Sequence, residues 1–229
     1  MAQGAGSVMA KRKQAGFRVA VSGHRLNQLP EAQRPALRAL IADALQALES
    51  SAREAGIKAP LILVSALAEG ADRFAAHAAK AKGWGLESPL PFLIPRYEKD
   101  FADEASITEF QALLKAADRV APIDGEALIA AGADGAAPYS AVGAALLKGA
   151  NALLAVWNGA PKKGPGGTAE VIENALASGM CVIWLAPDAS ATRLLLPSPL
   201  PAKGTHAAKM IRALQERMAL AQLPPLAQA

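Results

Sequence analysis

The sequence contains few of the residues on which the commonest structural and functional signatures depend. Its 229 residues include one cysteine, Cys181, and only 10 aromatic side chains. A single cysteine excludes a disulfide framework and a cysteine-based zinc site. No run of 18 or more apolar residues occurs, and residues 1–16 lack the apolar core of a signal peptide. We therefore expect a cytoplasmic protein with no membrane-spanning segment.

Alanine takes the place of the missing bulky residues. Hydrophobic residues make up 52% of the chain, but 55 residues are alanine, which buries little area and favours helices. The formal net charge is +4, and Lys11, Arg12 and Lys13 concentrate positive charge in a basic N-terminal tail. Because the positive excess lies near the ends of the chain, we do not expect a nucleic-acid partner.

Short apolar runs alternate with amphipathic helical stretches along the chain. Strands are expected at 17–21, 61–64, 89–94, 119–123, 151–157 and 181–185, and helices at 34–55, 69–82, 106–117, 139–149, 168–178 and 203–221. This alternation predicts βαβ units, and therefore one α/β Rossmann-like domain over 17–222. Its sheet should be mainly parallel, with about six strands and helices on both faces. Residues 1–16 and 223–229 are expected as flexible tails, and the Gly- and Ala-rich segment 124–138 as a flexible insertion.

In an open parallel sheet, ligands bind beyond the carboxyl ends of the strands. The loops after the first three expected strands supply these candidate ligand-binding residues: Ser22, Gly23, His24, Arg25, Ser65, Glu69, Gly70, Asp72, Arg73 and Tyr97. Arg25 suits a phosphate or carboxylate. Glu69 and Asp72 both suit the start of a helix as capping residues, and the alternative is that Glu69 faces the cleft and binds ribose hydroxyls. Tyr97 either stacks on a base or packs against the following helix.

The glycine-rich loop after the fifth expected strand is the strongest signal, because it leads directly into a helix. It supplies the candidates Asn158, Gly159, Gly164, Gly166, Gly167 and Thr168, with added charge from Lys162 and Lys163. Glycines let backbone N–H groups approach an anion, and the helix start adds partial positive charge. The Walker spacing is absent. We predict a phosphate-binding loop, with a purely structural loop as the alternative.

Taken in order, these loops resemble the SLOG superfamily, a Rossmann-like group related to LOG phosphoribohydrolases and DprA. The resemblance covers about residues 19–187 through SGHR at 22–25, SALAEGADR at 65–73, PFLIPRYEKDF at 91–101, LLAVWNG at 153–159 and GPGGTAEVI at 164–172. It implies a nucleotide-binding pocket at the strand carboxyl ends and a homodimer. No spacing typical of metal ligands occurs, and we expect neither a metal nor a cofactor.

The resemblance leaves three hypotheses for function. We favour binding or sensing of a nucleotide or nucleotide-derived ligand. The first alternative is LOG-like hydrolysis of nucleoside monophosphates to base and ribose 5-phosphate, in which Glu69 or Glu170 would be catalytic. LOG proteins place their catalytic glutamate three residues after the threonine, where this chain has Val171. The second alternative is DprA-like binding of single-stranded DNA.

Overall fold

The computed structural model describes residues 16–162 and 165–220. Within them, seven strands form one sheet, namely β1 (Phe17–Gly23), β2 (Leu61–Val64), β3 (Gly85–Leu90), β4 (Arg119–Pro122), β5 (Ala152–Val156), β6 (Cys181–Leu185) and β7 (Thr192–Leu195). Their order is β4-β3-β2-β1-β5-β6-β7. All neighbours pair in parallel except β6 and β7. The predicted α/β class with a mainly parallel sheet is confirmed.

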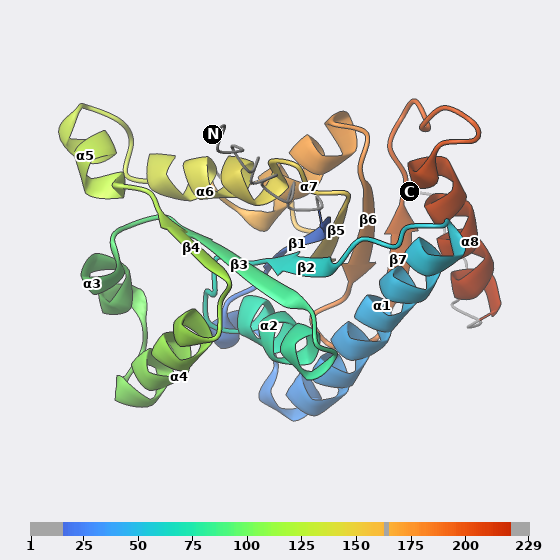
Figure 1. Cartoon of the computed structure of the whole chain (residues 1–229). Coiled ribbons are helices and arrows are strands. Elements are labelled where there is room, and N and C mark those ends of the chain that lie inside the picture. The colour runs from blue at the N-terminus through green and yellow to red at the C-terminus, as the bar shows by residue number, and fades with distance from the viewer. Residues whose placement is uncertain (1–15, 163–164, 221–229) are drawn as a thin grey trace, which may run out of the picture.

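Helices cover both faces of this sheet (Figure 1). They are α1 (Arg34–Glu54), α2 (Ala71–Ala81), α3 (Ile94–Tyr97), α4 (Glu104–Lys115), α5 (Gly125–Ala130), α6 (Ala137–Leu147), α7 (Thr168–Ala177) and α8 (His206–Leu220). Helices α1, α2 and α4 lie on one side of the sheet, and α6 and α7 lie on the other. The parallel strands β2 and β5 flank β1, and the helices that follow them lie on opposite faces of the sheet. Such a switch point opens a crevice at the carboxyl end of β1.

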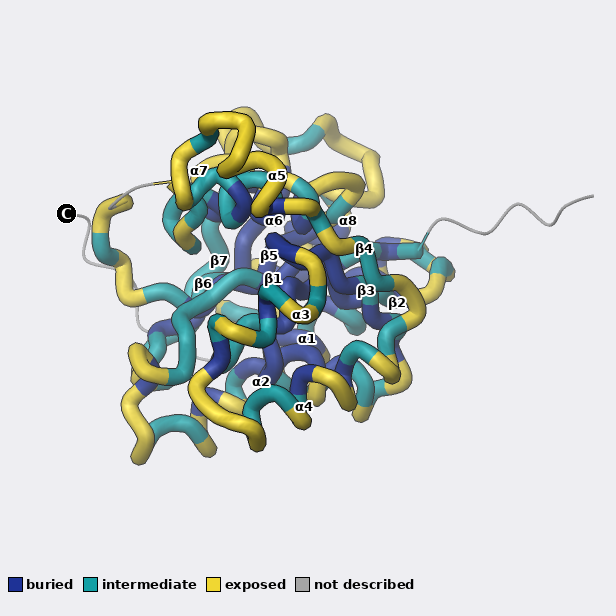
Figure 2. The backbone as a smooth tube through the Cα atoms, turned by 90° about the vertical axis from the view of Figure 1, so that its left-hand side faces the viewer, coloured by how far each residue is buried: buried dark blue, intermediate teal, exposed yellow. Residues whose placement is uncertain are grey.

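The core has two parts because the sheet is covered on both faces. Side chains of β1 alternate between them: Val19 and Val21 join the cluster under α1 and α2, whereas Ala20 joins the cluster under α6 and α7. Figure 2 shows the buried residues on the strands and the inner helix faces, with exposed residues on the outer turns. The small side chain of Ala20 lets α6 and α7 approach the sheet closely.

Local sequence explains where the helices begin and end. On α1, Leu37, Ile41, Leu45 and Leu48 recur at spacings of three and four residues and are all buried. Gly56 ends that helix with φ +84°, a conformation that costs a glycine little. The N-cap of α4 is Asp103, whose carboxylate accepts a hydrogen bond from the Ser106 N–H at 2.8 Å, as N-cap residues do.

The structure differs from the expected elements in three places. The strand expected at 89–94 lies at Gly85–Leu90, because Glu87 inside it forms an ion pair with Arg18 on the sheet surface. An apolar run alone could not indicate a strand that carries a charge. Strand β7, which follows a turn at Ala189 with φ +60°, was not expected at all.

The third difference concerns residues 124–138, expected as a flexible insertion. This segment contains α5 and the start of α6. Gly125 is buried, and a Cβ there would lie 2.4 Å from the carbonyl oxygen of Pro91 and 2.7 Å from the Phe92 ring. The glycine therefore serves close packing of α5 against the chain after β3. The expected tails lie outside the described residues, apart from Gly16.

Candidate functional site

A cleft of about 490 Å³ opens at the carboxyl ends of the central strands, between α2 and α3 on one side and α6 and α7 on the other. Its volume lies in the range of about 300–1,000 Å³ that is typical of small-molecule sites. The cleft brings together these predicted residues: Ser22, Gly23, His24, Arg25, Asp72, Tyr97, Asn158, Gly166, Gly167 and Thr168. Ser65, Glu69, Gly70, Arg73 and Gly159 do not line it. Gly164 and Lys163 lie outside the described residues.

The end of β1 forms the floor of the cleft and holds two neighbouring helices together. A Cβ on Gly23 would lie 2.5 Å from the Cβ of Ala71 at the start of α2, and 2.9 Å from the Cβ of Val156. Ser22 Oγ donates to Thr168 Oγ1 at the start of α7, at 3.3 Å. Residues 22 and 23 thus contact the N-termini of both α2 and α7.

His24 acts as a hydrogen-bond acceptor in the cleft wall. Its Nε2 accepts the backbone N–H of Asn158 at 3.1 Å, which requires that Nε2 carry no proton. Burial lowers the pKa of His24, and this effect outweighs that of the Asn158 side chain, which raises it. The imidazole is therefore neutral at pH 7. It holds the loop after β5, in which Asn158 Oδ1 also accepts from the Ala160 N–H at 3.0 Å.

The N-terminus of α7 points its backbone into the cleft. Gly167 is the N-cap, and no side chain caps the helix. The first N–H groups of an α-helix have no partner within the helix, so those of Thr168 and Ala169 are available to a ligand. A Cβ on Gly167 would meet no atom within 4 Å. Gly167, Thr168 and Ala169 all line the cleft, which makes this helix start a site for an anion.

Gly166, which lines the cleft, and Glu170, which does not, shape this loop. Gly166 has φ +83°, and a Cβ there would lie 2.7 Å from the Cβ of Tyr139. Glu170 accepts hydrogen bonds from the Gly166 N–H and from Ser140 Oγ, and it pairs with Lys162 at 3.3 Å. The Gly166 N–H, followed by Lys162, lowers the pKa of Glu170. The carboxylate that we considered catalytic is thus an ionised clamp on the loop.

A second cluster, centred on Asp100, borders the opposite wall. The Tyr139 hydroxyl donates to Asp100 Oδ2 at 2.6 Å, and Arg96 donates to Oδ1 at 2.7 Å. Burial, and then the bond to Asp100, raise the pKa of Tyr139 to about 12. Arg25 lies 3.9 Å from Asp100 Oδ2 and donates weakly to its carbonyl at 3.4 Å. Because these contacts are long, the Arg25 guanidinium has capacity to bind an anion in the cleft.

Asp72 and Tyr97 lie at the bottom of the cleft, where both are almost fully buried. Burial raises the pKa of Asp72 to about 7, against the lowering effect of the Ala68 backbone hydrogen bond. Burial also raises the pKa of Tyr97 above its ordinary range, and the neighbouring Asp72 charge adds to this effect. The Ser65 hydroxyl is 3.5 Å from Asp72 Oδ2. Asp72 is the one carboxylate among the described residues that line the cleft.

The start of α2 differs from the expected anion site. Gly70 is its N-cap with φ +95°, and a Cβ there would lie 2.7 Å from the His24 carbonyl oxygen. The Ala71 N–H donates to that same carbonyl at 3.2 Å. Glu69 turns away from the cleft and accepts from the Ala102 N–H at 3.0 Å and from Ser106 Oγ. Glu69 therefore holds the segment that leads into α4 and the first turn of that helix.

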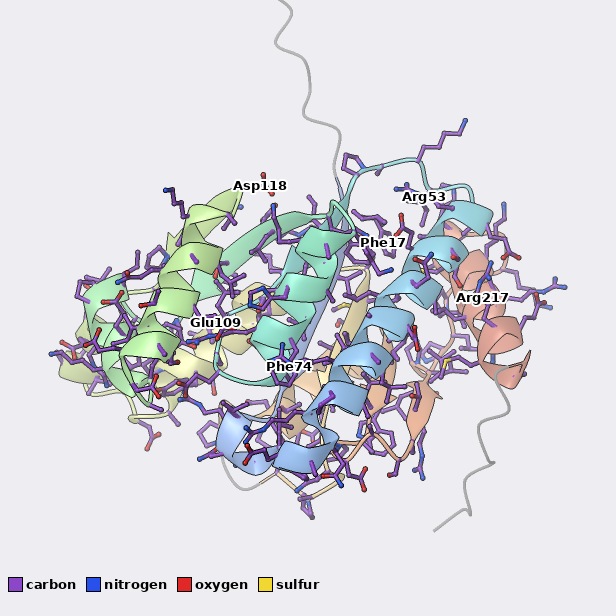
Figure 3. The ribbon with its side chains drawn as sticks, turned by 90° about the horizontal axis from the view of Figure 1, so that it is seen from below. Phe17, Arg53, Phe74, Glu109, Asp118 and Arg217 are labelled. Atoms are coloured by element: carbon purple, nitrogen blue, oxygen red, sulfur yellow. The ribbon has the colours of Figure 1, made fainter. Side chains whose placement is uncertain are left out.

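Arg73 is a buried structural residue and does not reach the cleft. Its guanidinium donates to the Leu67 carbonyl at 3.0 Å and to Glu109 at 3.0 Å, and it lies 4.5 Å from the centre of the Phe101 ring. Figure 3 shows Glu109 on α4, on the side that faces α2. Glu109 also contacts His77 at 2.8 Å. Arg73 thus ties α2 to α4 by hydrogen bonds and cation–π contact.

Sequence reasoning did not select several residues that complete the cleft. They are Gln28, Ala66, Ala68, Pro91, Tyr139, Val142, Gly143, Leu146, Trp157, Ala160, Pro161, Ala169 and Val171. Tyr139 and Gly143 lie on α6 and do not follow a strand, so the strand-end rule did not select them. Trp157 directly follows β5, and that position was the signal that could have identified it.

Two structural findings concern other kinds of site. Among the described residues, no group of three or more His, Cys, Asp or Glu side chains is placed to hold a metal ion. In residues 16–162 and 165–220, no helix has the length and apolar character needed to cross a membrane.

Comparison with known proteins gives matches in structure only. No protein-family model and no curated protein sequence matches the chain. DNA processing protein A (DprA) from Streptococcus pneumoniae has a similar structure, with a TM-score of 0.50 and 17% identity over 92% of this chain. The match covers 63% of the DprA chain, so this chain spans less than two thirds of it. The structural genomics target TM1055 gives a TM-score of 0.39 and 18% identity, covering 73% of this chain and 72% of TM1055.

At 17% identity, the likeness to DprA concerns the fold. The fold that the sequence resemblance implies is confirmed: this chain has a Rossmann-like α/β fold related to that of DprA.

Proposed function

We propose that the cleft binds a nucleotide or a nucleotide-derived ligand, with a phosphate group at the N-terminus of α7. The uncapped start of α7, which opens into the cleft through Gly167, is the observation that carries this proposal. Backbone N–H groups and the positive end of the helix dipole both favour a phosphate there. The Thr168 hydroxyl adds a further hydrogen-bonding group at the same position.

The cleft walls supply the other features that a nucleotide requires. Arg25 and Lys162 contribute positive charge to the cleft walls. Tyr139 and Trp157 contribute aromatic surface on which a base can pack, whereas Tyr97 is buried against Phe101 and Phe110. Charge at one end and aromatic surface around it fit a ligand with an anionic group attached to a flat ring system.

The carboxylates proposed for LOG-like hydrolysis do not support that alternative. Glu69 accepts a hydrogen bond from the Ala102 N–H before α4, and Glu170 accepts one from the Gly166 N–H in the loop before α7. Val171, at the position of the LOG catalytic glutamate, lines the cleft with an apolar side chain. Binding without turnover is therefore the function that these residues favour. The homodimer stays a prediction from the resemblance.

Calorimetric titration with nucleoside phosphates and their unphosphorylated nucleosides tests the proposal. We expect the phosphates to bind and the nucleosides to bind at least about tenfold more weakly, because they lack the charged group that α7 binds. Gly167→Val should abolish phosphate binding without a steric clash, since the new side chain enters open space in the cleft.

Gly135→Val is the matched control. Gly135 is exposed, lies outside the cleft, and has no atom within 4 Å of its Cβ position. Its affinity for nucleotide should equal that of the wild type. Equal binding of phosphates and nucleosides, or full affinity in Gly167→Val, would contradict the proposal. Chromatography of the titrated samples shows whether free base is released, and strongly salt-dependent binding of a single-stranded oligonucleotide alone would favour the DprA-like alternative.

A further inference from the structure

Asp72 is a buried carboxylate that the proposed phosphate contact does not use. Its exposed fraction is 4%, and its side chain still lines the cleft. Burying a carboxylate is costly unless a cation or hydrogen-bond donors compensate for the lost water. We therefore asked which groups of the protein provide that compensation, and which are left for a ligand.

The protein compensates Asp72 only in part. The Ala68 backbone N–H bonds to it, and the Ser65 hydroxyl lies at 3.5 Å, which is long for an O–H donor. Two arginines lower its pKa from a distance. Arg25 forms its ion pair with Asp100, and Arg73 forms its own with Glu109. No ion pair joins Asp72 to a described side chain, so its oxygens have capacity to accept further hydrogen bonds.

A role as a helix cap does not account for this burial. Gly70 is the N-cap of α2, and Asp72 is the second residue of that helix. An acidic residue in the first turn stabilises the helix dipole equally well when its carboxylate points to solvent. Exposed Asp103 does so at the start of α4 and caps it as well. Burial at the floor of a cleft is the feature that a capping role leaves unexplained.

The position of Asp72 relative to α7 indicates which part of a nucleotide it meets. β2 and β5 are the two neighbours of β1, α2 follows β2, and α7 follows β5. Neighbouring strands lie about 4.8 Å apart, so β2 and β5 are about 10 Å apart across β1. Ser22 at the end of β1 contacts Thr168 at the start of α7, and the next residue, Gly23, packs on Ala71 at the start of α2, so both helix starts border the same end of β1. In a nucleotide, the group bonded directly to the phosphate is the sugar. A phosphate at Thr168 therefore places the sugar, before the base, on the path towards Asp72.

We infer that Asp72 accepts hydrogen bonds from the ribose hydroxyls of the ligand and makes the cleft selective for ribonucleotides over 2′-deoxyribonucleotides. This inference rests on the proposed function. A carboxylate without protons is an acceptor, and the neighbouring 2′- and 3′-hydroxyls of ribose are two donors side by side. A ligand without the 2′-hydroxyl leaves one acceptor site of the buried carboxylate unpaired. A site built to hydrogen-bond a substrate hydroxyl discriminates strongly against the analogue that lacks this hydroxyl.

The charged and titratable groups around Asp72 determine how this selectivity depends on pH. Arg25 faces it from the segment after β1, Arg73 from α2 and Tyr97 from α3. Burial keeps Tyr97 protonated near neutral pH. Burial raises the pKa of Asp72 to about 7, so its preference for donors strengthens as the pH rises through that value.

The test compares AMP, GMP, CMP and UMP with their 2′-deoxy forms by calorimetry, at pH 6 and pH 8. Each pair has the same phosphate, so its titration cancels in the affinity ratio. We expect the wild type to bind the ribonucleotide at least about tenfold more tightly at pH 8, with a smaller ratio at pH 6. Asp72→Asn and Asp72→Ala should lower the ratio towards one, and the exposed control Asp43→Asn should leave it unchanged.

The outcomes separate this inference from the proposed function. If ribo- and deoxyribonucleotides bind the wild type equally, the role of Asp72 is refuted and the phosphate site stands. If the Asp72 variants weaken both ligands by the same factor, Asp72 is structural and the inference is likewise refuted. If none of these nucleotides binds at any pH, the proposed function fails and the inference fails with it.

Discussion

Replacing Asp72 by asparagine should stabilise the protein, and the gain should grow as the pH rises. Burial raises the pKa of this carboxyl group from 3.8 to about 7. Between those two values the folded protein holds a proton that the unfolded chain has already released. Stability is therefore fully present below about pH 4 and is lost progressively as the pH rises towards 7.

The size of this effect follows from the difference between the two pKa values. It is about 3 pH units, and each unit corresponds to about 1.4 kcal/mol, so the ionised carboxylate lowers the free energy of unfolding by roughly 4 kcal/mol above pH 8. Asparagine resembles the neutral acid in shape and carries no charge. Asp72→Asn should thus match the wild type near pH 4 and exceed its stability by up to about 4 kcal/mol at pH 8.

Urea unfolding, followed by the fluorescence of the three tryptophans, measures this difference at pH values from 4 to 8.5. Subtracting wild type from variant at each pH removes the contribution of the other titrating groups. The control Asp43→Asn alters an exposed carboxylate and should give a difference near zero throughout. A difference that does not vary with pH, or a wild type more stable than Asp72→Asn at pH 8, would refute the reasoning.

Three further substitutions test how the cleft is built. Gly23→Ala would place its Cβ 2.5 Å from that of Ala71 and should lower the free energy of unfolding by about 1–3 kcal/mol in urea titrations; an unchanged midpoint would contradict this close packing. Glu69→Gln should lower Tm by about 2–4 °C in calorimetry and leave nucleotide affinity unchanged. A loss of nucleotide binding in this variant would show that Glu69 takes part in ligand binding. Glu170→Gln should weaken nucleotide binding severalfold and speed hydrogen exchange at the Gly166 N–H, and neither effect should occur if the loop is held by other contacts.

The sequence predicted the layers of the fold better than the limits of its strands. Apolar runs such as that of β5 are buried on both faces, and such runs are visible without a structure. β3 was misplaced because Glu87 lies within it and pairs with Arg18 on another strand. A contact between positions 18 and 87 cannot be read from local composition. The antiparallel edge strand β7 is partly exposed along its whole length and has no strong apolar pattern.

The strand-end rule located the cleft, but it could not tell which way each side chain points. Gly167 and Thr168 were identified because glycine spacing before a helix is a local signal. Glu69 lies just before α2 and Asp72 in its first turn, yet Asp72 faces the cleft whereas Glu69 bonds to Ser106. Their directions depend on Gly70 and its positive φ, and on packing against segments distant in sequence. Physical contact across the sheet, rather than residue type, decides which acid is available to a ligand.

A crystal structure of the protein with a bound nucleoside phosphate tests the central claim most directly. The account predicts phosphate oxygens within hydrogen-bond distance of the backbone N–H groups at Gly167, Thr168 and Ala169, with the sugar directed towards Asp72. A nucleotide bound with its phosphate elsewhere, and with the start of α7 in contact with solvent alone, would contradict it.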